Sequence, residues 1–188
     1  HGTVFKITPT GLLTTLVQFT GIEGENLGSA GTAAMVQDSD GNFYGTTPSG
    51  GIDDDGTVFK MTPGGALTTL FDFGESQADE AGRNPRAALM QGGDGDFYGT
   101  TASGGADDKG TIFKITPEGV LTILFDFGAW ETDDNGWEPT VPLVEGSDGD
   151  FYGTTVSGGA DGKGTIFEMT PEGVVTTFHE FRGDGSSE

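Results

Sequence analysis

One repeat of constant length organises this sequence and restricts the folds that it can adopt. The segment Gly-Thr-Val-Phe-Lys-Ile-Thr-Pro begins at residue 2 and returns, with few changes, at residues 56, 110 and 164, always 54 residues apart. A second block, Phe-Tyr-Gly-Thr-Thr, begins at residues 43, 97 and 151. We therefore expect a single repeat domain, residues 1–188, built of repeats 2–55, 56–109 and 110–163 and a partial repeat 164–188.

Each repeat contains four short segments that are typical of β-strands. The second, third and fourth are rich in Thr, Val, Ile and Phe, which favour pleated surfaces, and none of the four keeps the apolar period of a helix. The first segment is short and apolar, the second is the Phe-Tyr-Gly-Thr-Thr block, and the third is the Gly-Thr-Val-Phe block. The first segment covers residues 33–36, 87–90 and 141–144, and the fourth covers 12–19, 66–73, 120–127 and 174–181.

Turn signals separate these segments and predict antiparallel hairpins. Asp-Gly stands between the first and second segments at residues 40–41, 94–95 and 148–149, a pair typical of a two-residue type I′ turn. A Pro-x-Gly turn separates the third and fourth segments in all four copies, for example at residues 117–119. Only the connection from the fourth segment to the next repeat is long and variable, as in residues 128–139.

Four antiparallel strands in a repeat of this length predict a β-propeller blade, so the fold class is all-β, with about three and a half blades. A β-trefoil is the main alternative, although the partial fourth repeat is then surplus, and tight hairpins argue against a β-solenoid. Pro142 lies in a first segment, which suits an edge strand. We expect the repeated Phe side chains of the second and third segments to be mostly buried: Phe5, Phe43, Phe59, Phe97, Phe113, Phe151 and Phe167.

Composition excludes several classes of function. The chain has 8 basic and 30 acidic residues, a formal charge of −22, so we expect no nucleic-acid partner and no binding to an anionic membrane surface. No apolar run is long enough for membrane insertion. Cysteine is absent and only two histidines occur, His1 and His179, so no thiolate chemistry or Ser-His-Asp set is available. We assign no catalytic residue and no cofactor other than a candidate Ca²⁺, and we do not expect an enzyme.

The sequence resembles a bacterial repeat family, the GloVer repeat of choice-of-anchor tandem-repeat proteins. The resemblance lies in Asn84-Pro85, Asp94-Gly-Asp-Phe-Tyr-Gly-Thr-Thr101, Ser103-Gly-Gly105 and residues 110–119, Gly-Thr-Ile-Phe-Lys-Ile-Thr-Pro-Glu-Gly. It implies a secreted or surface-anchored bacterial protein with many such repeats, and brings no known activity or catalytic residue. The first copy departs from the pattern, because Asn26-Leu27 and Ala30-Gly31 stand where Asn-Pro is expected.

The glycine-rich loop between the second and third segments contains the candidate metal ligands. Calcium prefers six to eight oxygen ligands, which carboxylates and backbone carbonyls supply. A solvated acidic loop that needs glycine for its backbone is the alternative interpretation. The candidate ligands are Asp53, Asp55, Asp107, Asp108 and Asp161. The Asp38–Asn42 turn also resembles the start of a calcium loop, but only the hairpin pair persists in the other copies.

The variable loop of the third copy contains a candidate carbohydrate site. Trp130 and Trp137 stand among Asp133 and Asp134, and tryptophan faces beside carboxylates suit stacking on sugars. The alternative is that one or both tryptophans cover the blade against its neighbour. Separately, Lys6, Lys60 and Lys114 share one position that becomes Glu168, and we expect these lysines to pair with strand acids at Asp72, Asp126 and Glu180.

These observations favour a non-enzymatic extracellular or cell-surface scaffold or binding module that presents variable acidic loops. A carbohydrate-binding or carbohydrate-active propeller and a self-assembling surface or filament component are the alternatives. The expected partners are further repeats of the same kind or identical chains, and carbohydrate in the second case. We expect the chain to belong to a longer repeat protein rather than to a closed homodimer, because its leftover half-blade does not complement a second one.

Overall fold

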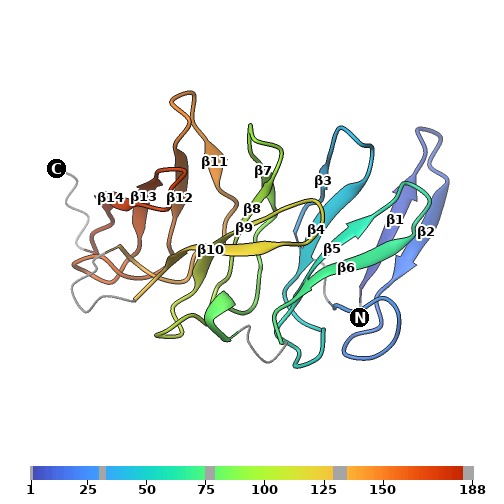
Figure 1. Ribbon diagram of the computed structural model, residues 1–188, viewed down its shortest axis with the longest axis horizontal. Coiled ribbons are helices and arrows are strands. Elements are labelled where there is room, and N and C mark those ends of the chain that lie inside the picture. Colours follow the sequence, from blue (N-terminus) through green and yellow to red (C-terminus); the bar gives the residue numbers. More distant parts are fainter. Residues whose placement is uncertain (1, 30–32, 75–78, 129–134, 184–188) are drawn as a thin grey trace.

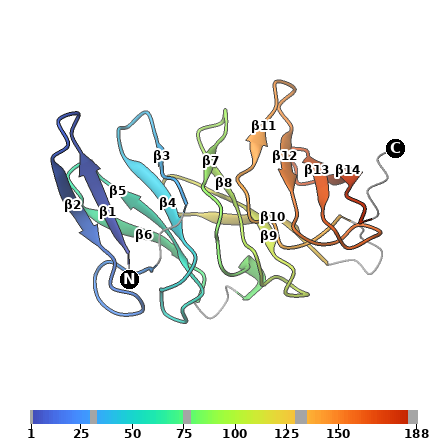
Figure 2. The ribbon, with the colours of Figure 1, turned by 180° about the vertical axis from the view of Figure 1, so that it is seen from behind.

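The computed structural model describes residues 2–29, 33–74, 79–128 and 135–183. These residues form antiparallel β-sheets, with one short 3-10 turn at Asp79–Ala81. The sheets stand side by side in chain order along the long axis of the molecule (Figures 1 and 2). Among the described residues no helix is long and apolar enough to cross a bilayer.

The strands group into one two-stranded and three four-stranded sheets. The half-sheet pairs β1 with β2, and each of sheets 1, 2 and 3 joins four consecutive strands in sequence order. The half-sheet is β1 (Thr3–Ile7) and β2 (Leu13–Gln18), and sheet 1 is β3 (Val36–Gln37), β4 (Phe43–Thr47), β5 (Thr57–Met61) and β6 (Leu67–Asp72). Sheet 2 is β7 (Met90–Gln91), β8 (Phe97–Thr100), β9 (Thr111–Ile115) and β10 (Leu121–Asp126), and sheet 3 is β11 (Val144–Glu145), β12 (Phe151–Thr154), β13 (Thr165–Met169) and β14 (Val175–Glu180).

The first strand of each four-stranded sheet is shorter than the sequence indicates. β3, β7 and β11 have two residues each, and they begin where an apolar segment of four was expected to end. The preceding residues face the neighbouring sheet instead: the Thr46 hydroxyl donates to the Ala87 carbonyl at 2.9 Å. β11 is an edge strand, and Pro142 precedes it. The end of each apolar segment thus pairs with the second strand of its own sheet, and the beginning contacts the neighbouring sheet.

The hairpin turns are tight, but they are not type I′ as the Asp-Gly pair indicates. Gly41 has φ +82°, whereas Asp40 is not among the described residues with positive φ. The Gly41 amide donates to the Asp38 carbonyl at 2.9 Å, and the Asp38 amide donates to the Asn42 carbonyl at 3.0 Å. This is a three-residue loop in which only the glycine has a left-handed backbone conformation. The aspartate keeps a negative φ, and its carboxylate can accept hydrogen bonds from the turn and from the sheet.

A β-bulge recurs at one position in every sheet. The register shifts between Val4 and Phe5 in the half-sheet and between Val58 and Phe59 in sheet 1, and the same irregularity occurs in sheets 2 and 3. A bulge strengthens the local twist of a strand. Each sheet therefore twists at the point where its central Phe turns toward the preceding sheet.

Aromatic rings build the core between neighbouring sheets. Edge-to-face pairs join Phe19 to Phe59, Phe73 to Phe113 and Phe127 to Phe167, with centroid distances of 5.5, 5.6 and 5.6 Å. A second row pairs Tyr44 with Phe97 at 4.1 Å and Tyr98 with Phe151 at 4.4 Å. Such pairs contribute about 0.5–1.5 kcal/mol beyond the area that they bury.

The expectation that the repeated phenylalanines are mostly buried is confirmed inside the stack and wrong at its first sheet. Phe59, Phe97, Phe113, Phe151 and Phe167 are buried. Phe43 is half-buried, and Phe5 is 55% exposed. The physical reason is that each ring is covered by the preceding sheet. No described sheet precedes the half-sheet, which carries Phe5, and the half-sheet in front of Phe43 has no described counterpart of Tyr44, the residue that covers Phe97.

Candidate metal centre

The hairpin between the first two strands of each sheet brings a tyrosine to a turn carboxylate. The hydroxyls of Tyr44, Tyr98 and Tyr152 donate to Asp40, Asp94 and Asp148 at 3.4, 2.9 and 2.8 Å. The turn also fixes the other oxygen of the carboxylate, because a backbone amide two residues later donates to it. The aspartate of the Asp-Gly pair is therefore a positioned acceptor as well as a turn residue.

In sheets 1 and 2 a lysine of the third strand completes this group. Lys60 Nζ lies 3.3 Å from Asp40 Oδ2. Lys114 Nζ lies 2.8 Å from Asp94 Oδ2 and 2.6 Å from Asp96 Oδ2. The register explains the contact, because Tyr44 pairs with Lys60 and Tyr98 with Lys114 across the ladder.

The predicted pairing of these lysines with acids of the fourth strand is wrong. Asp72 accepts the amides of Ile52 and Gly74 at 3.0 and 3.1 Å. Asp126 accepts the amide of Ala106 at 2.9 Å, and Glu180 accepts that of Ala160 at 3.0 Å. These carboxylates hold the glycine-rich loop in place, and the lysines are left for the hairpin turn on the other side.

The ammonium and the carboxylates of sheet 2 stabilise each other's charged forms. Burial by itself raises the pKa of Asp94, but hydrogen bonds from Lys114 and Tyr98 outweigh it and the pKa lies below its ordinary value. Hydrogen bonds to Asp94 and Asp96 raise the pKa of Lys114. Burial and the bond to Asp94 raise the pKa of Tyr98 to about 12. The group in sheet 2 is therefore centred on the Lys114 ammonium.

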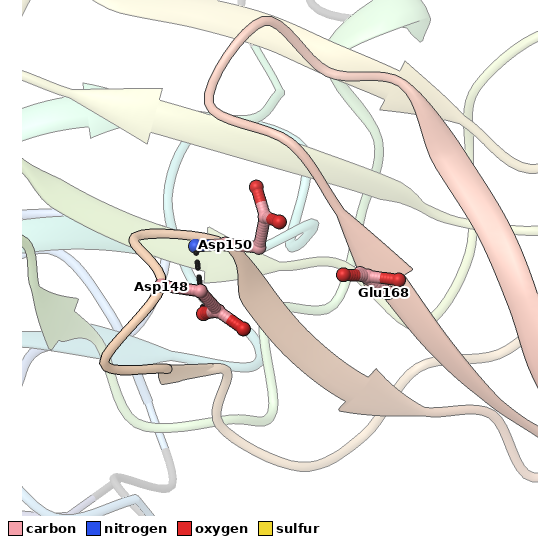
Figure 3. Close-up of side chains that lie close together, drawn as sticks. All are labelled: Asp148, Asp150 and Glu168. Carbon is pink, nitrogen blue, oxygen red and sulfur yellow. Dashed lines mark hydrogen bonds between the residues drawn. The ribbon is translucent and has the colours of Figure 1, made fainter.

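Sheet 3 keeps the two turn acids and replaces the cation by a third acid. Asp148, Asp150 and Glu168 each place a carboxylate oxygen within 4.8 Å of the others, as Figure 3 shows. The Asp150 amide donates to Asp148 Oδ1 at 3.2 Å. The Tyr152 hydroxyl lies 2.8 Å from Asp148 and 3.2 Å from Glu168. The bond from Tyr152 lowers the pKa of Asp148, and Asp148 raises the pKa of Tyr152.

The three equivalent groups differ in formal charge. Asp40 with Asn42 and Lys60 sums to zero, and Asp94, Asp96 and Lys114 sum to −1. Asp148, Asp150 and Glu168 sum to −3 when all three are ionised. Carboxylate oxygens that share a Ca²⁺ ion lie about 2.3–2.6 Å from it, so they can be up to about 5 Å apart. The spacing in sheet 3 meets this condition.

The comparisons with known proteins assign the repeat. The Gloeobacter/Verrucomicrobia repeat family matches residues 1–188. The chain belongs to this family. No curated protein is significantly similar in sequence. The repeat family itself names no ligand.

A solved structure shows the fold of these repeats. An X-ray structure provisionally described as a gluconolactonase matches with a TM-score of 0.52 and 10% sequence identity. The match covers 93% of this chain and 55% of that chain, so the residues here span about half its length. The protein is therefore a β-propeller, as the sequence predicts, with sheets 1 to 3 as blades.

The glycine-rich loop, in which the metal ligands were predicted, uses its aspartates differently from the hairpin turn. Asp54 and Asp108 have positive φ, and their carboxylates accept the amides of Gly50 and Gly104 at 2.6 and 2.7 Å. Arg83 also contacts Asp108 at 3.0 Å. In the described ranges, Asp148, Asp150 and Glu168 are the only three acidic residues close enough to share an ion. The five predicted ligands, Asp53, Asp55, Asp107, Asp108 and Asp161, are spread over three separate loops.

Part of the predicted carbohydrate site lies outside the described residues. This holds for Trp130, Asp133 and Asp134. Trp137 is 38% exposed, and Lys109 Nζ lies 5.5 Å from the centre of its ring. Its backbone pairs with Ser157, as Arg83 pairs with Ser103 in the preceding blade. The carbohydrate site stays a prediction.

The sequence contained the signal for the group in sheet 3, but the signal was divided between two motifs. Asp148 and Asp150 belong to the turn, and Glu168 stands at the lysine position of the third strand. Only the strand register places the two together, since Tyr152 pairs with Glu168.

His179 is an exposed residue of β14, where its ring contacts Phe181.

Proposed function

We propose that this protein is a non-enzymatic extracellular or cell-surface scaffold whose repeated frame binds Ca²⁺ in its third blade. One observation carries the proposal: the same turn carboxylates hold an ammonium in sheets 1 and 2 and meet Glu168 in sheet 3. The ammonium contacts are independent support for a cation at this position. In sheets 1 and 2 the carboxylates of this hairpin lie next to a positive charge, which supports a cation at the equivalent position of sheet 3.

Charge and exposure set the expected affinity. Three carboxylates so close together repel one another, and a bound cation converts that repulsion into attraction. The described group supplies three carboxylates and the Tyr152 hydroxyl, so water would complete the six to eight ligands of Ca²⁺. Asp148 is exposed, and Asp150 and Glu168 are half-buried. A shallow site with several waters corresponds to the weak extracellular class, with Kd of about 10⁻⁴–10⁻³ M.

The frame itself suits a scaffold. Core positions repeat with the same aromatic residues, while one surface position changes from Lys to Glu without any change in strand register. The backbone is thus independent of the chemistry that it presents. An acidic surface of −22 overall is consistent with an environment that contains divalent cations.

A calcium titration with matched variants tests the proposal. Thermal melts in EDTA and in increasing CaCl₂ should show a rise in Tm of roughly 3–5 °C at a tenfold excess over Kd. Glu168→Lys should remove the rise, because it recreates the lysine-centred group of sheet 2, and it should raise the Tm in EDTA. Glu172→Lys makes the same charge change in an exposed turn and should keep the calcium response. A rise that survives in Glu168→Lys, or no rise in the wild type, would refute the site.

A further inference from the structure

Asn135 stands directly before Gly136 in the segment that leads into sheet 3, and the sequence contains no other Asn-Gly pair. Asn135 is half-buried and Gly136 is buried. The structure requires glycine here, because φ is +86° and an added Cβ would overlap the Thr155 hydroxyl oxygen and lie 2.8 Å from that of Thr165. The amide nitrogen that follows Asn135 therefore belongs to a residue without a side chain, which leaves it open to approach by the Asn135 side chain.

Two threonines of sheet 3 hold the oxygens of this asparagine. The Thr165 hydroxyl of β13 donates to the Asn135 backbone carbonyl at 2.8 Å, and the Thr177 hydroxyl of β14 donates to Asn135 Oδ1 at 2.8 Å. Among the described residues, neither Asn135 Nδ2 nor the Gly136 amide has a hydrogen-bond partner. Both oxygens of Asn135 are thus polarised by a donor, and the two nitrogens are left free.

Only one of these two hydrogen bonds belongs to the repeated frame. In sheet 2 the Thr111 hydroxyl donates to the Ala81 carbonyl at 2.8 Å, one repeat before the bond from Thr165 to Asn135. The second pair differs, because Ala81 and Ile123 stand where sheet 3 has Asn135 and Thr177, and both belong to one apolar cluster. The frame therefore folds without the asparagine and its threonine, and this polar pair is specific to the third blade.

An asparagine that is followed by glycine can cyclise. The glycine amide loses its proton to hydroxide, and its nitrogen forms a bond to the Cγ atom of asparagine. The bond from Cγ to the side-chain nitrogen then breaks, and this nitrogen leaves as ammonia with a proton from water. Water opens the resulting succinimide ring at one of its two carbonyl carbons and gives aspartate or isoaspartate.

We propose that Asn135-Gly136 is a site of succinimide formation in the folded protein and that the hydroxyls of Thr177 and Thr165 assist the reaction. The Thr177 hydroxyl stabilises the negative charge that develops on Oδ1 when the nitrogen adds to Cγ. The Thr165 hydroxyl withdraws electrons from the peptide group between Asn135 and Gly136 and makes its N–H more acidic. Because Nδ2 is not held by a described residue, it can leave.

The Asp-Gly pairs of the hairpin turns meet neither requirement. Their glycine amides are engaged, since Gly41 and Gly95 donate to backbone carbonyls at 2.9 and 3.0 Å. Their carboxylates are ionised, because hydrogen bonds hold the pKa values of Asp40 and Asp94 below the ordinary value, and an ionised carboxylate resists a nucleophile. The third turn follows the same pattern. The reaction is therefore selective for Asn135.

The product changes both charge and backbone. Either product replaces a neutral amide by a carboxylate, and isoaspartate also adds a carbon atom to the main chain before Gly136. Trp137 follows at once, and its amide donates to the Ser157 carbonyl at 2.9 Å. Lys109 Nζ lies over the ring of this tryptophan. Conversion of Asn135 should therefore alter how Trp137 is presented on this face of the blade.

Peptide mapping of aged protein tests the proposal. The folded chain is incubated in EDTA at several mildly alkaline pH values, and mass spectrometry and isoaspartate methyltransferase labelling follow each asparagine. Asn135 should convert, faster at higher pH because its neighbour must lose a proton. Asn42 should persist, and so should Asn84, which precedes a proline that has no N–H. Thr177→Val should slow the conversion about tenfold, the effect of one ordinary hydrogen bond, and Thr177→Ser should restore it.

Two results would overturn the proposal. Conversion of Asn135 in urea but not in the folded chain would show that the fold protects this residue. An equal or faster rate in Thr177→Val would show that the hydroxyl does not assist, and thermal melts of this variant and of Thr177→Ser ensure that folded proteins are compared. Because the incubation is carried out in EDTA, a failed calcium test leaves this proposal unaffected.

Discussion

The first strand of the half-sheet, β1, and the third strand of sheet 2, β9, have nearly the same sequence in different surroundings. Residues 2–9 and 110–117 differ at one position, where Val4 is replaced by Ile112. Phe5 is nevertheless 55% exposed, and Phe113 is 0% exposed. The β1 and β9 strands also have the same bulge at this residue. The local fold therefore follows from the repeat itself, whereas burial follows from the neighbouring sheets.

The opposite end of the described stack gives the same result. Phe127 of sheet 2 is 0% exposed, whereas Phe181, its equivalent after β14, is 41% exposed. Phe127 is covered by Phe167 of the next sheet. In a repeat protein, stability is approximately a sum over units and their interfaces, so equivalent residues can differ widely in their contribution.

Truncation of the central phenylalanine should show the largest difference between the two regions. Phe113→Ala removes a fully buried ring from the contact with Phe73 and should lower the free energy of unfolding by about 3–5 kcal/mol. Phe5→Ala removes an exposed ring and should cost less than about 1 kcal/mol. Urea unfolding of both variants measures the difference. Equal losses would show that the two sheets are equally covered in solution.

A methyl group added at the glycine of the second strand should have the next largest effect. Gly99 pairs with Phe113, and a Cβ at this position would overlap both the Phe113 ring and Leu89. Gly99→Ala should therefore destabilise the protein by about 1–3 kcal/mol. Gly64→Ala is the control, because its nearest neighbour lies 3.8 Å away and its φ is not positive. A neutral Gly99→Ala would mean that the ring has room to move.

The fold could be predicted further than the site because they depend on different information. Repeat length, Asp-Gly and Pro-x-Gly turns, and apolar strands are local signals, and they specify four antiparallel strands with the correct phase. The group of Asp148, Asp150 and Glu168 joins a turn and a strand that are separated in sequence. Its detection required the register that pairs Tyr152 with Glu168. The alternation of side chains along the third strand does not by itself show that the lysine position lies on the same face as the turn.

Alkaline titration should distinguish a tyrosine inside the stack from a free one. The pKa of Tyr98 is raised to about 12 by burial and by the bond to Asp94, and the pKa values of Tyr44 and Tyr152 are also raised. The folded state thus holds the phenolic proton more tightly than the unfolded chain. The resulting stability is complete below pH of about 10 and is lost as the pH rises toward 12.

The measurement is the ultraviolet absorbance of tyrosinate during a pH titration. Native protein should show little tyrosinate near the ordinary phenol pKa, and urea-unfolded protein should titrate normally. Tyr98→Phe should remove one of the delayed transitions. A native curve that coincides with the unfolded one would contradict the aspartate-bound position of these hydroxyls.

The smallest effect should come from the lysine position, where the half-sheet again serves as the control. Lys114 bridges Asp94 and Asp96, but its ion pairs are partly exposed, so Lys114→Met should cost only about 0.5–1 kcal/mol and less at high salt. Lys6 has the same place on β1, but no described turn faces it, and Lys6→Met should be close to neutral. The difference between the two variants should disappear in molar NaCl, because screening removes the Coulomb attraction and leaves the strand packing intact. A difference that persists in salt would assign the role of Lys114 to the contact of its aliphatic chain with Tyr98.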